Sequence, residues 1–153
     1  MNGWKPWTTQ YILRQQARRS EYGKAEFNTG MGCGPFGAVK EQSSGLYAQK
    51  MAELGFLTIA FDPSYTGESG GTPRYVASPD INTEDFCAAV DFLSVQENVD
   101  PEHIGIIGIC GWGGMAINAA AIDTRIKATA AMTMYDMTRF LPGTGTGCTG
   151  ILL

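Results

Sequence analysis

The side chain with the clearest setting for chemistry is the thiol of Cys110, within Gly108-Ile109-Cys110-Gly111-Trp112-Gly113. The β-branched run from Ile104 to Ile109 predicts a buried strand before it, and Met115 to Ile122 predicts a helix after it. A nucleophile on a tight turn between strand and helix needs small neighbours, and a helix N-terminus both favours a thiolate and stabilises an oxyanion. The segment therefore predicts a nucleophile elbow, with Cys110 as nucleophile and the Gly111 N–H as an oxyanion donor.

Two alternatives stay open for this segment. Trp112 stands two residues after Cys110, where a small residue is usual. A frame shifted by two residues fits the spacing of small residues better, but it puts the chemically inert Trp112 in the nucleophile position. The other alternative is that Cys110 is a buried structural thiol at a tight strand–helix junction.

A cysteine nucleophile needs a neighbouring base, and the chain has a single histidine, His103. His103 begins the predicted strand that Cys110 ends, which places the two side chains roughly 20 Å apart. Because hydrogen-bond contact needs about 3 Å, His103 is not expected to be the base. Asp136 follows the last predicted strand, and without a histidine to orient it is expected to be a surface charge.

Composition excludes several classes of function. The 153 residues suffice for one domain with one core, and a net charge of −4 argues against binding to nucleic acid. No run approaches the ~20 apolar residues of a membrane span, and the first residues do not form a signal peptide. Four widely spaced cysteines predict a reducing compartment, hence the cytoplasm, and neither a metal site nor a cofactor is expected: Cys33, Cys87, Cys110 and Cys148.

The order of predicted elements indicates an α/β fold with a mostly parallel sheet and helices on both faces. A helix that starts at Ser43 or Ser44 and stops at Gly55 precedes a strand, Phe56 to Phe61, and the loop Asp62 to Gly71. A second helix is expected to begin at Asn82 or Thr83, and a last strand at Ile126. We expect three parts: an unassigned segment 1–30, which includes a short polar helix over 10–22, a core 31–139, and a Gly/Thr-rich tail 140–153. The GxGxxG spacing of 145–150 lacks the strand and helix of a phosphate loop, so the tail is interpreted as flexible.

Three segments together resemble the α/β-hydrolase superfamily, in its dienelactone-hydrolase-like and peptidase-like esterase branch. Gly34 to Gln42 is similar to the loop that lends an oxyanion-hole N–H, and the resemblance assigns that donor to Phe36 or Gly37, because Pro35 has no N–H. Ala60 to Gly71 is similar to the family's D-x-x-G-x-G-x-S loop. Asp100 to Gly114 matches the elbow, with Cys in place of Ser, as in dienelactone hydrolases. The resemblance covers about residues 32–139, which implies a partial α/β-hydrolase fold, and neither end of the chain matches.

The resemblance implies a hydrolase that acts on a small-molecule carboxylic ester or related acyl compound through Cys110. In the family the acid and the histidine follow later strands than this chain contains. The alternative is a truncated, non-catalytic fragment or pseudoenzyme, whose uncovered sheet would favour homo-oligomers. A third hypothesis, a nucleotide-binding doubly wound domain, lacks the Gly-rich loop after a first strand and the acidic residue ~20 positions further on.

Overall fold

The computed structural model describes residues 12–14, 29–134 and 151–152. Its main sheet has five strands in the order β1-β3-β2-β5-β6. Neighbouring strands among β2, β3, β5 and β6 pair in parallel, and β1 pairs antiparallel with β3. The bounds of these strands are β1 Ile12–Arg14, β2 Thr29–Cys33, β3 Leu57–Ala60, β5 Ile104–Ile109 and β6 Ile126–Met132. The mostly parallel sheet of the predicted α/β-hydrolase fold is therefore confirmed.

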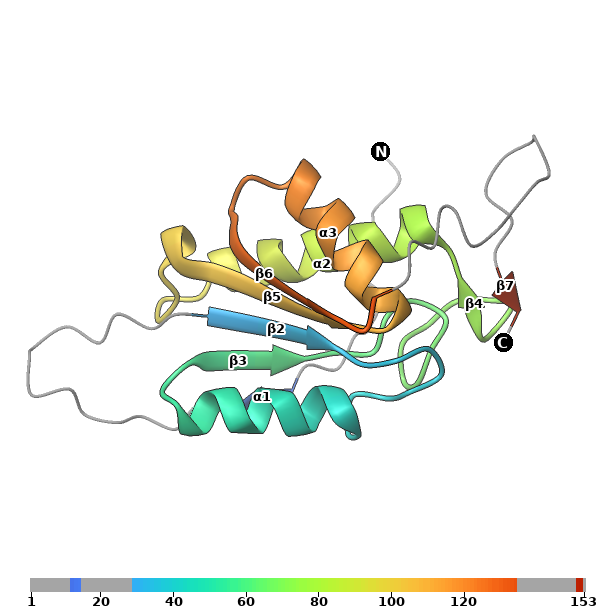
Figure 1. Ribbon diagram of the computed structural model, residues 1–153, viewed down its shortest axis with the longest axis horizontal. Helices are drawn as coiled ribbons and strands as arrows, with labels where there is room; N and C mark the ends of the chain where they lie inside the picture. The colour runs from blue at the N-terminus through green and yellow to red at the C-terminus, as the bar shows by residue number, and fades with distance from the viewer. Residues whose placement is uncertain (1–11, 15–28, 135–150, 153) are drawn as a thin grey trace, which may run out of the picture.

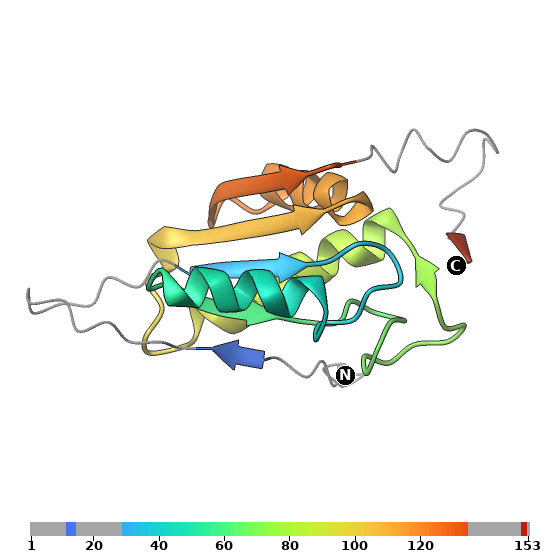
Figure 2. The same cartoon turned by 60° about the horizontal axis from the view of Figure 1, so that its bottom comes forward.

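Three helices cover the two faces of this sheet. Helix α1, Ser43–Glu53, packs on β2 and β3 from one side, whereas α3, Gly111–Ile122, packs on β5 and β6 from the other (Figures 1 and 2). Helix α2, Pro79–Ser94, packs against α3. A single-turn 3-10 helix, η1 Pro101–His103, leads into β5, and a short strand, β4 Val76–Ala77, pairs with β7, Ile151–Leu152.

The hydrophobic core lies between the sheet and α2 with α3. Phe86, Val90 and Leu93 of α2 are completely buried, as is Ile104 of β5. These side chains pack in one cluster with Met31 and with residues of β3 and α3. The cluster fixes the two helices against the strands, and so sets where α3 begins relative to the end of β5.

Both α2 and α3 begin earlier than the sequence predicts. The expected start of α2 at Asn82 or Thr83 is wrong, because the helix begins at Pro79, where a proline fits the first helical position. The side chain of Asn82 is completely buried and accepts a hydrogen bond from the N–H of Ser78, 2.8 Å away. Helix α3 begins at Gly111, not at Met115, so the glycines expected in the turn belong to the helix.

The helix predicted near the N-terminus is not found among the described residues. A polar helix was expected over residues 10–22, but Ile12–Arg14 forms β1, with Ile12 paired to Ala60; pairing with an existing sheet overrides the weak local preference for a helix. Strand β2 covers Thr29–Cys33 and so crosses the expected boundary between the unassigned segment and the core. Most of the predicted segments 1–30 and 140–153, including the GxGxxG spacing of 145–150, lie outside the described residues.

The register of the parallel strands brings three connecting segments to the same end of the sheet, where the strands reach their C-terminal residues. Cys33 pairs with Gly108, and Ile109 pairs with Met132, so β2, β5 and β6 end side by side. Ala60, the last residue of β3, pairs with Gly32. The segment after β2, the loop after β3 and the junction of β5 with α3 therefore meet at the same end of the molecule.

Candidate active site

Cys110 is the single residue between β5 and α3, and its backbone is strained. Its φ is 61° and its ψ is −130°, a conformation that costs a non-glycine residue on the order of 1–3 kcal/mol. Two hydrogen bonds hold it there: the N–H of Cys110 donates to the carbonyl of Met132 at 2.9 Å, and the N–H of Gly113 donates to the carbonyl of Cys110 at 3.0 Å. The half-buried thiol thus stands directly before the N-terminus of a 12-residue helix.

Two glycines allow the strand and the helix to approach each other here. A Cβ on Gly108 would lie 2.5 Å from the carbonyl oxygen of Trp112 and 2.7 Å from the Cβ of Ala116. A Cβ on Gly113 would lie 2.8 Å from the Cβ of Met134. The close approach after Cys110 therefore falls on Gly113, three residues along, which leaves the position of Trp112 open to a large side chain.

The Trp112 side chain is part of the core. It is 4% exposed, and its ring contacts the ring of Phe86 edge-on at a centroid distance of 6.2 Å. Because Trp112 belongs to α3 and not to the turn, the frame that would place it in the nucleophile position does not fit the structure. Its size is accommodated by the cluster beneath the elbow.

The segment after β2 forms a tight turn beside the elbow. The N–H of Ala38 donates to the carbonyl of Pro35 at 3.0 Å, and Gly37 has a φ of +76°, which is typical of a type II turn with Phe36 and Gly37 at its centre. The ring of Phe36 lies on Gly111: a Cβ there would be 2.7 Å from Cδ2 of the ring and nearer still to Cε2 and Cζ. The structure thus places Phe36 against Gly111, with Gly37 and Cys110 as their respective neighbours in the chain.

A buried lysine, which the sequence did not single out, anchors the segment that carries this turn. Nζ of Lys40 lies 3.1 Å from Oδ2 of Asp62, 2.7 Å from Oε2 of Glu68 and 2.8 Å from Oε1 of Glu41. Burial alone would lower the pKa of Lys40, but the hydrogen bonds to the three carboxylates outweigh it and raise the pKa above its ordinary value. Lys40 therefore remains charged although it is buried.

A second polar cluster fastens the loop after β3 to α2. Asp85 accepts hydrogen bonds from Oγ of Ser64 at 2.6 Å, from the N–H of Ser64 at 2.9 Å and from the amide of Asn82 at 2.9 Å. Burial raises the pKa of Asp85, even though the donors from Ser64 and Asn82 favour its charged form. The cluster holds the loop against the first turns of α2.

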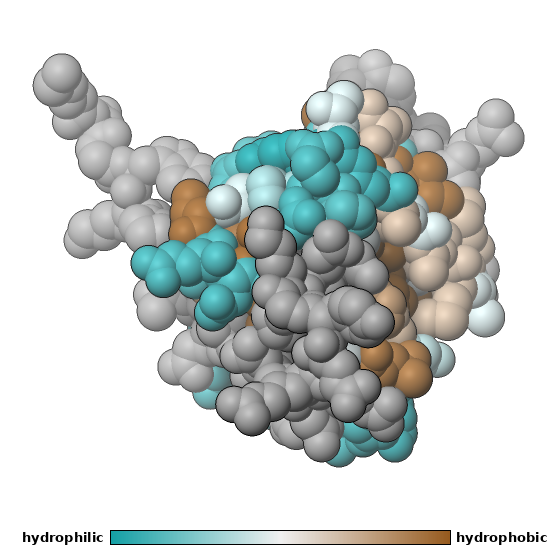
Figure 3. All heavy atoms as spheres, turned by 90° about the vertical axis from the view of Figure 1, so that its left-hand side faces the viewer, coloured by the Kyte–Doolittle hydropathy of each residue, from teal (hydrophilic) through white to brown (hydrophobic). Residues whose placement is uncertain are grey.

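His103 lies at the other end of β5 from Cys110, as predicted. It is the last residue of η1, its side chain is half exposed, and its Nδ1 lies 2.7 Å from Oδ2 of Asp100. Figure 3 views the molecule from this end, where hydrophilic side chains gather among the described residues. His103 is thus separated from Cys110 by the whole length of the strand, while Asp136 lies outside the described residues.

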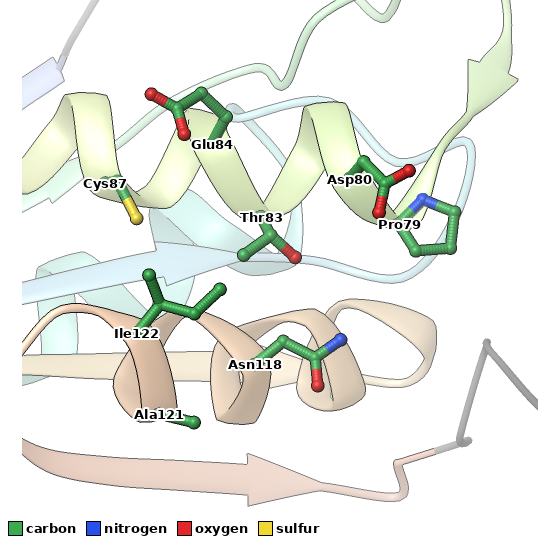
Figure 4. Close-up of a pocket in the computed structure, with 8 residues that line it drawn as sticks. All are labelled: Pro79, Asp80, Thr83, Glu84, Cys87, Asn118, Ala121 and Ile122. Carbon is green, nitrogen blue, oxygen red and sulfur yellow. The ribbon is translucent and has the colours of Figure 1, made fainter. Parts of the chain in front are cut away.

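A groove of about 370 Å³ lies between α2 and α3. Thr83 and Cys87 face Asn118 and Ile122 across it (Figure 4). Burial raises the pKa of the Cys87 thiol, and the carboxylates of Glu84, Asp123 and Asp91 raise it further. Cys110 is not among the residues that line the groove, and the thiol of Cys87 lacks the environment of a nucleophile.

The part of the chain that contains this strand, strained cysteine and helix also matches a known protein family. A model of the dienelactone hydrolase family matches residues 36–136, which is more than half of the chain. The chain belongs to the dienelactone hydrolase family. This confirms the resemblance noted over residues 32–139, and the match contains Phe36, Gly37, Cys110 and Gly111.

Individual relatives of this dienelactone hydrolase family member share only part of their length with it. The uncharacterized protein PA2218 of Pseudomonas aeruginosa is 75% identical over 108 residues, which are 71% of this chain and 29% of PA2218. Its crystal structure aligns with a TM-score of 0.74 at 57% identity, over 87% of this chain and 44% of that one. Thiohydrolase aneE of Aspergillus aculeatus is 40% identical over 92 residues, or 60% of this chain and 29% of aneE.

A more distant solved structure shares the fold. The α/β hydrolase GrgF from a Penicillium species aligns with a TM-score of 0.67 at 20% identity, over 79% of this chain and 44% of that one. The chain therefore has part of the α/β-hydrolase fold and spans less than half the length of these relatives. Within the described ranges no helix is both long and apolar enough to cross a membrane. The His, Cys, Asp and Glu side chains of that part of the chain form no group of three that could hold a metal ion.

Proposed function

We propose that this chain carries the nucleophile and the oxyanion donors of an acyl hydrolase, and that it cleaves small carboxylic esters or acyl thioesters. The observation that carries the proposal is the strained backbone of Cys110 directly before α3. A non-glycine residue is kept at positive φ only where the surrounding structure fixes it, and such strain is common at catalytic positions. Membership of a hydrolase family and the printed name of the relative aneE, a thiohydrolase, support the choice of acyl substrates.

The reaction would proceed through an acyl-enzyme. The sulfur of Cys110 forms a bond to the acyl carbonyl carbon, the C=O π electrons move to the oxygen, and the N–H groups of Gly111 and of Phe36 or Gly37 stabilise that oxyanion. The oxygen returns its electron pair as the alcohol or thiol leaves, and the leaving group takes up a proton. Water then attacks the thioester and releases the carboxylic acid, which restores the thiol.

The proton transfers need a base that is not His103, the chain's single histidine. His103 pairs with Asp100 at the far end of β5. In triad hydrolases, oxyanion stabilisation and substrate binding alone still leave about 10³-fold rate enhancement when a triad member is lost. We therefore expect slow turnover in which solvent, buffer or another chain accepts the proton.

The test is hydrolysis of p-nitrophenyl acetate by the purified chain, measured beside Cys110→Ala and Cys87→Ala. Cys87 is the matched control, because it is a second half-buried thiol in a groove away from the elbow. We expect turnover to vanish with Cys110→Ala and to persist with Cys87→Ala. Equal rates for the unmodified chain and Cys110→Ala would contradict a nucleophilic role.

A second candidate function is a non-catalytic fragment with the packing of a hydrolase. It is favoured by the position of His103, and by β6, whose residues from Lys127 to Ala130 are all exposed. In this case Cys110 would serve only the tight junction of β5 and α3. The same assay decides between the two candidates, because a non-catalytic fragment requires identical rates of ester hydrolysis for the unmodified chain and Cys110→Ala.

A further inference from the structure

We propose that the side chain of Phe36 is a positioning residue, which fixes the two oxyanion donors relative to each other by resting on Gly111. This inference rests on the proposed function, because it concerns the alignment of groups around Cys110. It assigns a role to a side chain in a turn whose backbone alone was expected to matter.

The contact between the ring and Gly111 leaves no room for a side chain. A Cβ on Gly111 would come within 3 Å of three ring carbons of Phe36, a separation that would force either the ring or the helix to move. The φ angle of Gly111 is not positive, unlike that of the glycines whose backbone conformation favours glycine elsewhere in the described residues. Glycine is therefore needed after Cys110 because of the ring above it, and not because of its own backbone conformation.

The ring is supported from beneath by aromatic side chains that reach into the core. Phe36 contacts Trp112 at a centroid distance of 5.6 Å with the ring planes inclined at 56°. Trp112 contacts Phe86, and Phe86 in turn meets Phe61 edge-on at 5.7 Å. Because Trp112 and Phe86 are buried, this series gives the half-buried ring of Phe36 a rigid base.

This geometry links the two donors through one residue. The N–H of Phe36 belongs to the turn Pro35–Ala38, while its ring rests on the residue whose N–H is the first of α3. The aromatic ring thus lies between the turn and the start of the helix and limits how closely they approach each other. An oxyanion donor acts fully only when it is held at the right distance beforehand, so removal of the ring should weaken the stabilisation of the oxyanion.

The test combines Phe36→Ala, Gly111→Ala and the double variant, with Phe92→Ala as the control. Phe92 is also a partly buried phenylalanine packed on the core, but it lies near the C-terminal end of α2. One readout is the kcat and KM of p-nitrophenyl acetate hydrolysis. The other is 19F NMR of a trifluoromethyl ketone, to whose carbonyl carbon the sulfur of Cys110 adds, while the π electrons form the oxyanion and the thiol proton goes to solvent.

We expect Phe36→Ala to lower kcat about tenfold with little change in KM, and to weaken the ketone adduct by a similar factor. Gly111→Ala alone should lower kcat and weaken the adduct at least as much as Phe36→Ala does. In the Phe36→Ala background it should change both quantities little, because space for the new methyl group exists there. Phe92→Ala should leave both readouts near those of the unmodified chain.

Two results would overturn the inference while leaving the proposed function intact: an unchanged kcat and adduct in Phe36→Ala, or an equal effect of Gly111→Ala in both backgrounds. If the unmodified chain forms no adduct and its ester turnover equals that of Cys110→Ala, the proposed function fails, and the inference fails with it.

Discussion

Nζ of Lys40 lies 3.1 Å from Oδ2 of Asp62, with side-chain exposures of only 3% and 1%. Oδ1 of the same carboxylate accepts the backbone N–H of Lys40 at 2.7 Å, and Oδ2 accepts the N–H of Glu68 at 3.0 Å. Asp62 therefore ties the segment that carries the Phe36 turn to the loop after β3. The position of the proposed oxyanion donors depends on this tie as well as on the ring of Phe36.

Lys40→Met should destabilise the fold strongly. The substitution removes the partner of Asp62 and leaves a buried carboxylate without a counter-charge, which typically costs about 3–5 kcal/mol. Urea unfolding followed by far-UV circular dichroism measures the loss. Lys50→Met is the matched control, because Lys50 pairs with Glu53 at 2.9 Å on an exposed face and should cost about 1 kcal/mol or less. Equal losses in the two variants would contradict the role of Lys40.

The raised pKa of Asp85 predicts a specific dependence of stability on pH. Because the folded state binds this proton more tightly than the unfolded state, the contribution of Asp85 is fully present below its ordinary pKa of 3.8 and is lost as pH rises through the folded value. The free energy of unfolding of the unmodified chain should therefore improve relative to Asp85→Asn as the pH falls from 7 towards 4.

Asp100→Asn provides a control of opposite sign. The hydrogen bond from the N–H of Glu102 and that with His103 lower the pKa of Asp100, so its contribution is present above 3.8 and is lost as pH falls through the folded value. As the pH falls, the free energy of unfolding of the unmodified chain should decrease relative to that of Asp100→Asn. If the difference in unfolding free energy from the unmodified chain changed with pH in the same direction for Asp85→Asn and Asp100→Asn, the opposite pKa shifts of the two carboxyl groups would be contradicted.

Added imidazole should accelerate ester hydrolysis in a way that depends on Cys110. If the thiol lacks only a base, a small diffusible base can take the proton that a histidine would take. We expect the rate of p-nitrophenyl acetate hydrolysis to rise with imidazole concentration by several-fold more in the unmodified chain than in Cys110→Ala. The variant corrects for the hydrolysis that imidazole causes by itself, so identical slopes would count against a missing base.

The outer strand β6 should promote self-association. Four consecutive residues, Lys127 to Ala130, are exposed on this strand, and in the described part of the chain it pairs only with β5. Such an edge offers unpaired N–H and C=O groups to a second copy. Light scattering coupled to size exclusion should show assemblies that grow with concentration and diminish in Ala130→Lys. A monomer at every concentration would contradict the expectation.

Local patterns revealed most of the framework around the site. The isoleucines of β5 and the alternation of strands with helices predicted the parallel sheet, and the small residues near Cys110 predicted the elbow. The start of α3 was misjudged because glycines disfavour a helix intrinsically, whereas packing demands them here: Gly111 lies against Phe36, and Gly113 lies against Met134 and Gly108. Local preference and tertiary packing make opposite demands at Gly111 and Gly113, and packing prevails.

The interactions that hold the site were hidden for a different reason. Lys40 and Asp62 are separated by a helix and a strand, and a lone lysine in a sequence ordinarily indicates solvent exposure. The ring of Phe36 meets Gly111 only because β2 and β5 pair in register, so no pattern near either residue could reveal their contact. Trp112 looked out of place in the elbow because its burial depends on Phe86, on another helix.

The position of β2 also determines when the fold can form during synthesis. This early strand is flanked on both sides by later ones, since Thr29 pairs with Leu57 and with Ile104. The ribosome must therefore release β3, α2 and β5 before the middle of the sheet is closed, and until then β2 keeps one side unpaired. A nascent chain stalled after α2 would carry an open sheet edge that chaperones or other nascent chains can bind.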